Sequence, residues 1–159
     1  MEKKRIAIHE AGHLTVCFRL GWEVKNIKRT ENSPYSLCYE KNGIEYYVKP
    51  QNDAQKEHNF ERICIAWGGG IMEEREFGDL WMTGGKKSVY GDEETVKKLI
   101  YYNKEEIRYS QKAMRQSDII LQNNRTIFLK IFRVVQDFLN NPSDFNKHKL
   151  ELNKRFKSN

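Results

Sequence analysis

The sequence of 159 residues predicts an α+β fold that is mainly helical and contains one small antiparallel β-sheet. Apolar residues recur at helical spacing near the N-terminus and through the second half of the chain, whereas short β-type runs occur only between residues 24 and 48. No repeat, low-complexity tract or linker divides the chain. We therefore expect a single domain over residues 1–159, with a C-terminal helical bundle from about residue 111.

The N-terminal part is expected to hold one helix followed by three short extended segments. The helix covers residues 5–20, because apolar side chains recur along one face and Gly21 follows as a stop. The extended segments cover residues 24–29, 35–40 and 44–48. The last two flank Asn42-Gly43, a strong signal for a β-hairpin.

A second helix is expected from an Asn52-Asp53 cap to about Arg75, with Gly78 ending it. Three consecutive glycines at positions 68–70 lie inside this helix, where each costs about 1 kcal/mol relative to alanine. Close approach of another helix would compensate for that cost.

The second half is expected to be helical after a loop over residues 79–91. One helix begins near Asp92 and directs Val96, Leu99 and Ile100 inward, and a long helix covers residues 117–140 and stops before Pro142. Ser143-Asp144 can cap a last short helix, which carries Phe145, Leu152 and Phe156 on one face.

The sequence His9-Glu10-Ala11-Gly12-His13 is an H-E-x-x-H motif on the first predicted helix. Residues four apart on a helix lie about 40° apart on one face, so both imidazoles can bind one Zn²⁺. Glu10 lies beside them, where a carboxylate can act as general base. Two packed, hydrogen-bonded histidines are the alternative. The small residues between the histidines and the apolar residues before them favour the metal site.

A catalytic zinc ion usually has three protein ligands, so a third is required. Cys17 is too far along the helix axis and is better explained by core packing, while His58 and His148 lie in polar contexts typical of surface residues. An acidic ligand is therefore expected, and the candidates are Glu73, Glu74, Asp79 and Asp92. Glu73 or Glu74 could instead accept a hydrogen bond from a zinc-bound histidine.

The chain resembles the peptidase domain of FtsH-type zinc proteases. Residues 6–13 resemble that family's V-A-x-H-E-A-G-H, and residues 68–78 are similar to its G-G-R-A-A-E-E-x-x-F-G. Thr83-Gly84-Gly85 with Gly91-Asp92 resembles T-G-A-S-N-D, although this segment is about three residues longer here. Weaker similarity continues from Ile120 to Leu129. The resemblance covers most of the chain.

The resemblance implies a zincin-type peptidase in which His9, His13 and Asp92 bind Zn²⁺ and Glu10 is catalytic. The metal site would occupy about residues 1–110. Only eight residues precede His9, so we expect a stand-alone peptidase without the family's ATPase module. It would hydrolyse unfolded or flexible polypeptides independently of ATP, either as a homo-oligomer or with a separate ATPase partner. The alternative is a catalytically silent zinc-binding regulatory or interaction module.

The composition bears on location and partners. The longest apolar run has five residues, which excludes a transmembrane segment. The chain has no secretory signal, and its three cysteines are widely spaced, so we expect a cytoplasmic protein without disulfides. The net charge of +6 comes from residues 81–159, which carry 16 basic and 9 acidic side chains. The basic C-terminal segment could contact nucleic acid or an anionic membrane, but a solvated last helix is the preferred interpretation.

Overall fold

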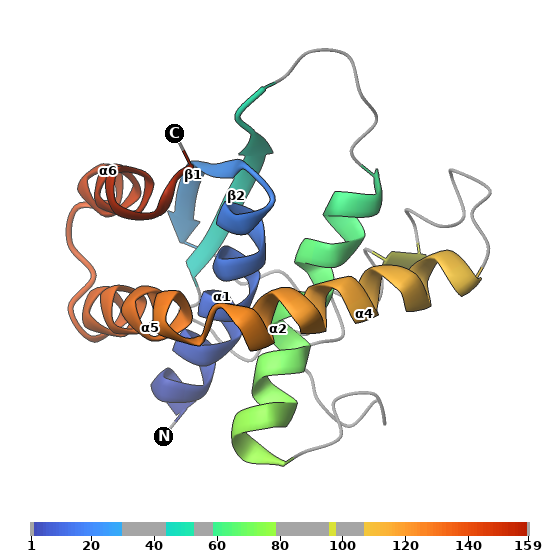
Figure 1. Cartoon of the computed structure of the whole chain (residues 1–159). Helices are drawn as coiled ribbons and strands as arrows, with labels where there is room; N and C mark the ends of the chain where they lie inside the picture. The colour runs from blue at the N-terminus through green and yellow to red at the C-terminus, as the bar shows by residue number, and fades with distance from the viewer. Residues whose placement is uncertain (1, 30–43, 53–58, 79–95, 98–106, 159) are drawn as a thin grey trace.

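The structure is a computed structural model that describes residues 2–29, 44–52, 59–78, 96–97 and 107–158 (Figure 1). Its elements are α1 (Glu2–Arg19), β1 (Trp22–Arg29), β2 (Ile44–Pro50), α2 (Asn59–Phe77), α4 (Ile107–Asn123), α5 (Arg125–Asn140) and α6 (Phe145–Phe156). Within these ranges the protein is mainly helical with a two-stranded antiparallel sheet. The predicted α+β class is confirmed.

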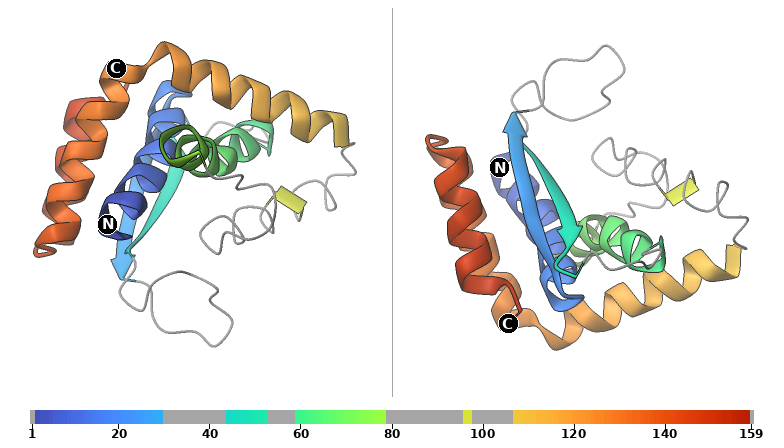
Figure 2. Two further views of the ribbon diagram at one scale, coloured as in Figure 1. Left: turned by 90° about the horizontal axis from the view of Figure 1, so that it is seen from below. Right: turned by 90° about the horizontal axis from the view of Figure 1, so that it is seen from above.

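Helix α1 lies at the centre of the molecule, with α2 on one side and α5 and the sheet on the others (Figure 2). Its residues Ala7, Ala11, Leu14 and Phe18 are buried, as expected for an amphipathic helix that faces several neighbours. The helix ends where Gly21 adopts a positive φ of 81°, a conformation that favours glycine. The predicted helix over residues 5–20 is confirmed with one extra turn at its start.

The sheet pairs β1 with β2, from Trp22 opposite Pro50 to Arg29 opposite Ile44. The register shifts between Val24 and Asn26, which leaves Lys25 as the extra residue of a β-bulge. Two of the three predicted extended segments are therefore strands. The third, over residues 35–40, and the Asn42-Gly43 turn lie outside the described residues.

Helix α2 packs against α1 through glycine, as the sequence predicted. A Cβ atom added to Gly68 would lie 2.7 Å from the Gly12 carbonyl oxygen, so the two backbones approach closely only because both residues lack a side chain. The helix ends before Gly78, whose φ is 70°. The helix was predicted to begin at an Asn52-Asp53 cap. Asp53 lies outside the described residues, and α2 is described from Asn59.

The prediction of one long helix over residues 117–140 is wrong, because two helices meet at Asn124. The Asn124 side-chain Nδ2 donates to the Ile120 carbonyl oxygen at 2.7 Å, and its backbone adopts φ −128° and ψ 36°. A short polar side chain that binds the preceding turn offers the backbone an alternative to the helical ladder. The first helix also begins earlier than predicted, at Ile107.

Individual side chains cap the start of the last helix, α6, and hold the helix against the rest of the protein. Asp144 caps it by accepting a hydrogen bond from the Lys147 backbone N–H at 3.0 Å, as predicted. Leu152 is fully buried, and Phe145 and Phe156 pack against the core. Asn153 bonds to both the N–H and the carbonyl of Val24, each at 2.9 Å, which attaches α6 to the outer edge of β1.

The remaining predictions concern the helix expected from Asp92 and the absence of a membrane span. Val96, on the helix expected from Asp92, is helical and buried, and most of that helix lies outside the described residues. No helix within the described ranges is long and apolar enough to cross a bilayer.

Candidate metal centre

The two histidines of the motif lie together on the face of α1 that meets α2. Their Nε2 atoms are 2.9 Å apart, and the rings are arranged edge to face with centroids 4.5 Å apart. His9 is buried and His13 is half-buried. The predicted juxtaposition of the imidazoles is therefore present.

The other ring nitrogen of each histidine lies against an acceptor. His13 Nδ1 donates to the Ile65 carbonyl oxygen at 2.6 Å, and His9 Nδ1 lies 2.6 Å from Glu73 Oε1. A carbonyl oxygen can only accept, so His13 Nδ1 carries a hydrogen, and the carboxylate beside His9 Nδ1 favours a hydrogen on that nitrogen as well. In neutral imidazoles both Nε2 atoms then present lone pairs to each other. Such an arrangement favours a cation at the two nitrogens.

Glu73 connects the histidine pair to an arginine. Its second oxygen, Oε2, accepts from Arg5 Nε at 2.8 Å, and the carboxylate is only 1% exposed. Arg5 also lies over the Phe77 ring at 4.8 Å. The sequence predicted that Glu73 or Glu74 could assist a histidine, but it did not identify Arg5. The position of Arg5 one turn before His9 on the same helix could have indicated that Arg5 lies near the histidine pair.

The second glycine of the run in α2 makes room for the imidazoles. A Cβ atom on Gly69 would lie 2.5 Å from His13 Nε2 and 2.7 Å from His9 Nε2. Real side chains do not approach this closely, so any larger residue would displace the rings. Gly69 thus forms a cradle directly beside the two nitrogens that would bind a metal.

These features fit a zinc site. Two nitrogens bound tetrahedrally to one zinc at about 2.0–2.1 Å would lie about 3.3 Å apart, close to the 2.9 Å observed here. Metal-binding histidines usually donate their other ring hydrogen to a carboxylate or a carbonyl. His13 makes such a bond to the Ile65 carbonyl, and His9 Nδ1 has a carboxylate oxygen of Glu73 in close contact. The type of the two nitrogen atoms and the distance between them are therefore suitable for zinc.

The third ligand is not identified by the described residues. Among them, no group of three or more His, Cys, Asp or Glu is arranged to hold a metal. Glu73 and Glu74 are therefore not brought into such a group, and the Glu73 oxygens engage His9 Nδ1 and Arg5 instead. Asp92 and Asp79 lie outside the described part of the chain, so their assignment stays a prediction.

Glu10 is half-buried on α1 and acts electrostatically on the sheet. Burial, and secondly the negative charge of Glu10, raise the pKa of Tyr46 well above its ordinary value. Tyr46 belongs to β2, so the carboxylate acts on the strand that lies nearer α2 (Figure 2). The Glu10 carboxylate is thus within electrostatic range of β2.

The prediction that His148 is a surface residue is wrong. Its ring is 4% exposed, stacks on Phe138 with centroids 3.9 Å apart and bonds to the Tyr46 hydroxyl at 2.8 Å. The polar neighbours in sequence concealed that residue 148 shares the inner face of α6 with Phe145 and Leu152. His58 lies outside the described residues.

The buried cysteines are core residues. Cys17 is fully buried, and burial raises the pKa of its thiol, with a smaller contribution from Glu23. Burial also raises the pKa of Cys64 to about 12. Thiols that resist ionisation are poor nucleophiles and metal ligands, which agrees with the packing interpretation of Cys17.

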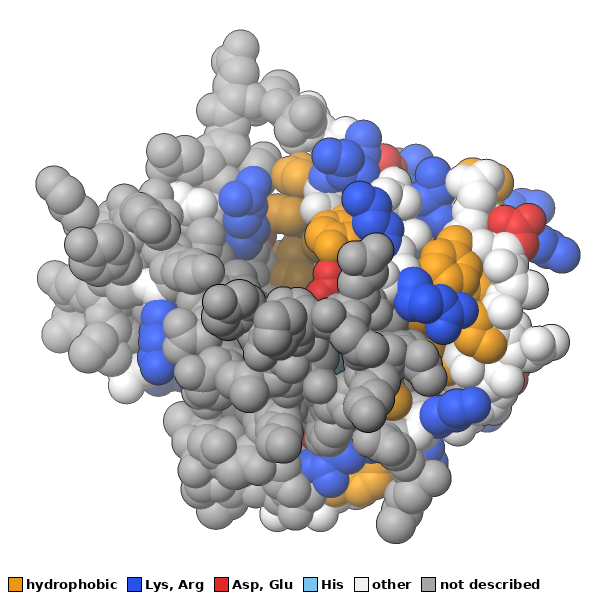
Figure 3. All heavy atoms as spheres, turned by 180° about the vertical axis from the view of Figure 1, so that it is seen from behind, with side chains coloured by type: hydrophobic (Ala, Val, Ile, Leu, Met, Phe, Trp, Pro, Cys, Tyr) orange, Lys and Arg blue, Asp and Glu red, His pale blue; other side chains and the backbone are white. Residues whose placement is uncertain are grey.

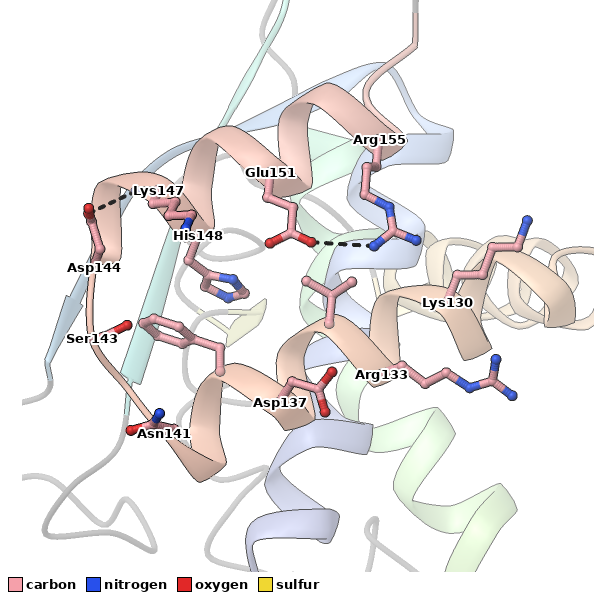
Figure 4. A pocket seen from close by; sticks show the side chains of 12 residues that line it. Lys130, Arg133, Asp137, Asn141, Ser143, Asp144, Lys147, His148, Glu151 and Arg155 are labelled. Carbon is pink, nitrogen blue, oxygen red and sulfur yellow. Dashed lines mark hydrogen bonds and ion pairs between the residues drawn. The ribbon is translucent and has the colours of Figure 1, made fainter.

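A groove of about 550 Å³ lies between α5 and α6, away from the histidine motif (Figure 4). The described residues that line it come from α5, α6 and their connection, with His148 among them. Both basic and acidic side chains line it, and Glu151 pairs with Arg155 at 3.4 Å. It is therefore a feature of the C-terminal helices rather than part of the candidate metal centre.

Comparisons of the chain with models of protein families, with curated proteins and with solved structures gave no match. The support for a metal at the candidate centre therefore comes from its geometry and from the sequence motif.

Proposed function

We propose that this protein is a zinc-dependent metalloendopeptidase. The observation that carries the proposal is the convergence of two Nε2 atoms, 2.9 Å apart, from histidines whose Nδ1 atoms lie against the Ile65 carbonyl and the Glu73 carboxylate. Glu10 lies between these histidines in sequence, where a purely structural zinc site would not require a carboxylate. The resemblance of residues 6–13 and 68–78 to FtsH-type peptidases also supports a zincin-type site.

In this mechanism His9 and His13 hold the metal, with Asp92 as the expected third ligand. A bound zinc ion would lower the pKa of a coordinated water and polarise the substrate carbonyl. The Glu10 carboxylate accepts a proton from the attacking water and transfers it to the departing amine nitrogen. Glu73 and the Ile65 carbonyl keep the histidine rings oriented throughout.

The substrate would be an extended, unfolded stretch of polypeptide. Strand addition supplies main-chain hydrogen bonds with little dependence on sequence. The outer edge of β1 is covered by Asn153 of α6, so that edge does not accept a strand at Val24. The β2 side, which lies towards α2 and is influenced by Glu10, is the side on which we place the substrate.

The proposal is tested by metal content and proteolysis together. Purified protein should contain about one zinc per chain and cleave casein, chelation should abolish cleavage and added zinc should restore it. Glu10→Gln should retain zinc and lose at least about 100-fold in kcat. Glu74→Gln, a carboxylate outside the histidine network, is the control and should retain activity.

Two results would contradict the proposed enzyme. Cleavage by a zinc-loaded Glu10→Gln variant at the wild-type rate would show that Glu10 is not the base. A zinc-loaded wild-type protein that cleaves no member of a broad peptide library would instead favour the silent zinc-binding module. Absence of zinc binding in both His9→Ala and wild-type protein would exclude either function.

A further inference from the structure

A second groove, of about 390 Å³, lies between β1 and α6 and is strongly basic. It contains no residue of α1 or α2, so it is separate from the candidate metal centre. In the described part of the chain, its lining consists of five lysines, one acidic residue, Glu23, and three uncharged residues. The lysines are Lys25, Lys49, Lys149, Lys154 and Lys157.

We infer that this lysine groove binds acidic polypeptide segments. Such binding is independent of the proposed peptidase activity.

The groove holds one carboxylate of its own. Glu23 Oε1 lies 3.6 Å from Lys49 Nζ, and Glu23 Oε2 lies 3.1 Å from Lys157 Nζ. Glu23 is 19% exposed, whereas both lysines are more than 40% exposed. Flexible ammonium groups at the rim therefore reach inward to a carboxylate. An acidic side chain of a partner could be held in the same way.

Three lysines remain for a partner. Lys25, Lys149 and Lys154 have no ion pair among the residues that the structure describes. Lys25 is the extra residue of the β-bulge, a feature that can redirect a side chain out of the strand pairing. The groove therefore keeps a net positive charge after Glu23 is counted. Seen from behind, Lys and Arg also predominate over acidic side chains on the described part of the surface (Figure 3).

The walls favour a peptide over a nucleic acid. Leu150, on the rim, is 56% exposed and offers an apolar contact beside the lysines. Among the described residues, no aromatic or arginine side chain lines the groove, although single-stranded nucleic acids are usually held by stacking on such groups. An acidic segment that carries one apolar side chain complements both the positive charge of the groove and the exposed side chain of Leu150.

The occupant is held through its side chains rather than as an added strand. Both main-chain polar groups of Val24 are already bonded to Asn153 on the groove floor. A partner therefore finds no free strand edge at this residue. This distinguishes the groove from the β2 side of the sheet, where the peptidase substrate is placed.

Binding can be tested by fluorescence anisotropy with a labelled peptide of Glu and Asp residues around one central Leu. Wild-type protein should bind it with an affinity that falls as salt rises, and should bind the matched Gln/Asn peptide at least about tenfold more weakly. The double variant Lys149→Glu/Lys154→Glu should also lose at least about tenfold. Lys112→Glu/Arg115→Glu, on the exposed face of α4, makes the same charge change and should bind normally.

A second arm tests the apolar contact. Leu150→Ser, or Ser in place of the peptide's Leu, should each weaken binding several-fold, and the two together should weaken it little further. Circular dichroism confirms that each variant is folded. The inference is overturned if both charge variants lose affinity equally, if the Gln/Asn peptide binds as well, or if oligothymidylate or phosphatidylserine vesicles displace the peptide more effectively than unlabelled peptide does.

Discussion

At the residue scale, the candidate centre depends on the contacts that orient each imidazole. His9 lies between His13 on one ring nitrogen and Glu73 on the other, and Glu73 is held in turn by Arg5. A buried carboxylate in this position increases the electron density on the histidine and fixes its tautomer. The metal affinity should therefore depend on a residue that does not contact the metal.

This dependence leads to a prediction for Glu73→Gln. Zinc affinity should fall by about 10–100-fold, because the amide keeps the shape of the side chain but loses its negative charge. Competition with a chromophoric chelator measures the affinity. Glu74→Gln, one position further along α2, should bind zinc like the wild type. Equal affinities of wild type and Glu73→Gln would show that the carboxylate has no such role.

At the element scale, the arrangement of α1 and α2 is set by glycine. Gly12 and Gly68 allow the backbones to meet, and Gly69 leaves the space beside the histidines. The sequence predicted the close approach because three helical glycines required compensation. It also correctly predicted the Asp144 cap and the end of α5 before Pro142. It failed at Asn124, because the hydrogen bond to Ile120 that breaks the helix has no clear signature in hydrophobic periodicity.

The close contact between α1 and α2 can be tested by whether Gly68→Ala raises or lowers the free energy of unfolding. Alanine in place of glycine normally stabilises a helix interior by about 1 kcal/mol. Gly68→Ala should instead lower the free energy of unfolding by about 1–3 kcal/mol, because its Cβ would overlap the Gly12 carbonyl. Urea denaturation measures the change. Gln111→Ala, at an exposed position of α4, should change stability by less than about 0.5 kcal/mol, and a stabilised Gly68→Ala would contradict the packing.

At the scale of the whole molecule, His148 joins α6 to the sheet and to α5. Its ring bonds to Tyr46 of β2 and stacks on Phe138 of α5. Burial lowers the pKa of His148 to about 4 from its ordinary value of about 6.5. The unfolded chain therefore binds a proton in a range where the folded protein does not, and stability falls as the pH decreases from about 6.5 to about 4.

This linkage predicts a pH-dependent difference between wild type and His148→Gln. The stability advantage of the wild type should be largest above pH 6.5 and should shrink by up to about 2 kcal/mol at pH 5. Urea denaturation at pH 7.5 and pH 5 measures both proteins. Lys147→Gln is the neighbouring control, and its stability difference from wild type should be the same at both values. An unchanged His148→Gln difference would show that the histidine is not buried in its neutral form.

Features that depend on residues close together in the chain could be predicted from the sequence alone. The four-residue step from His9 to His13 fixes both imidazoles on one helical face, and Asp144 can cap the helix that follows it. The surroundings of these residues depend on how distant parts of the chain pack together. Glu73 meets Arg5 across 68 positions, and Asn153 meets Val24 across 129. Such contacts arise from the packing of whole elements, so no local pattern specifies them. This is why the orientation of the histidines, the burial of His148 and the lysine groove emerge only when the helices and strands are assembled.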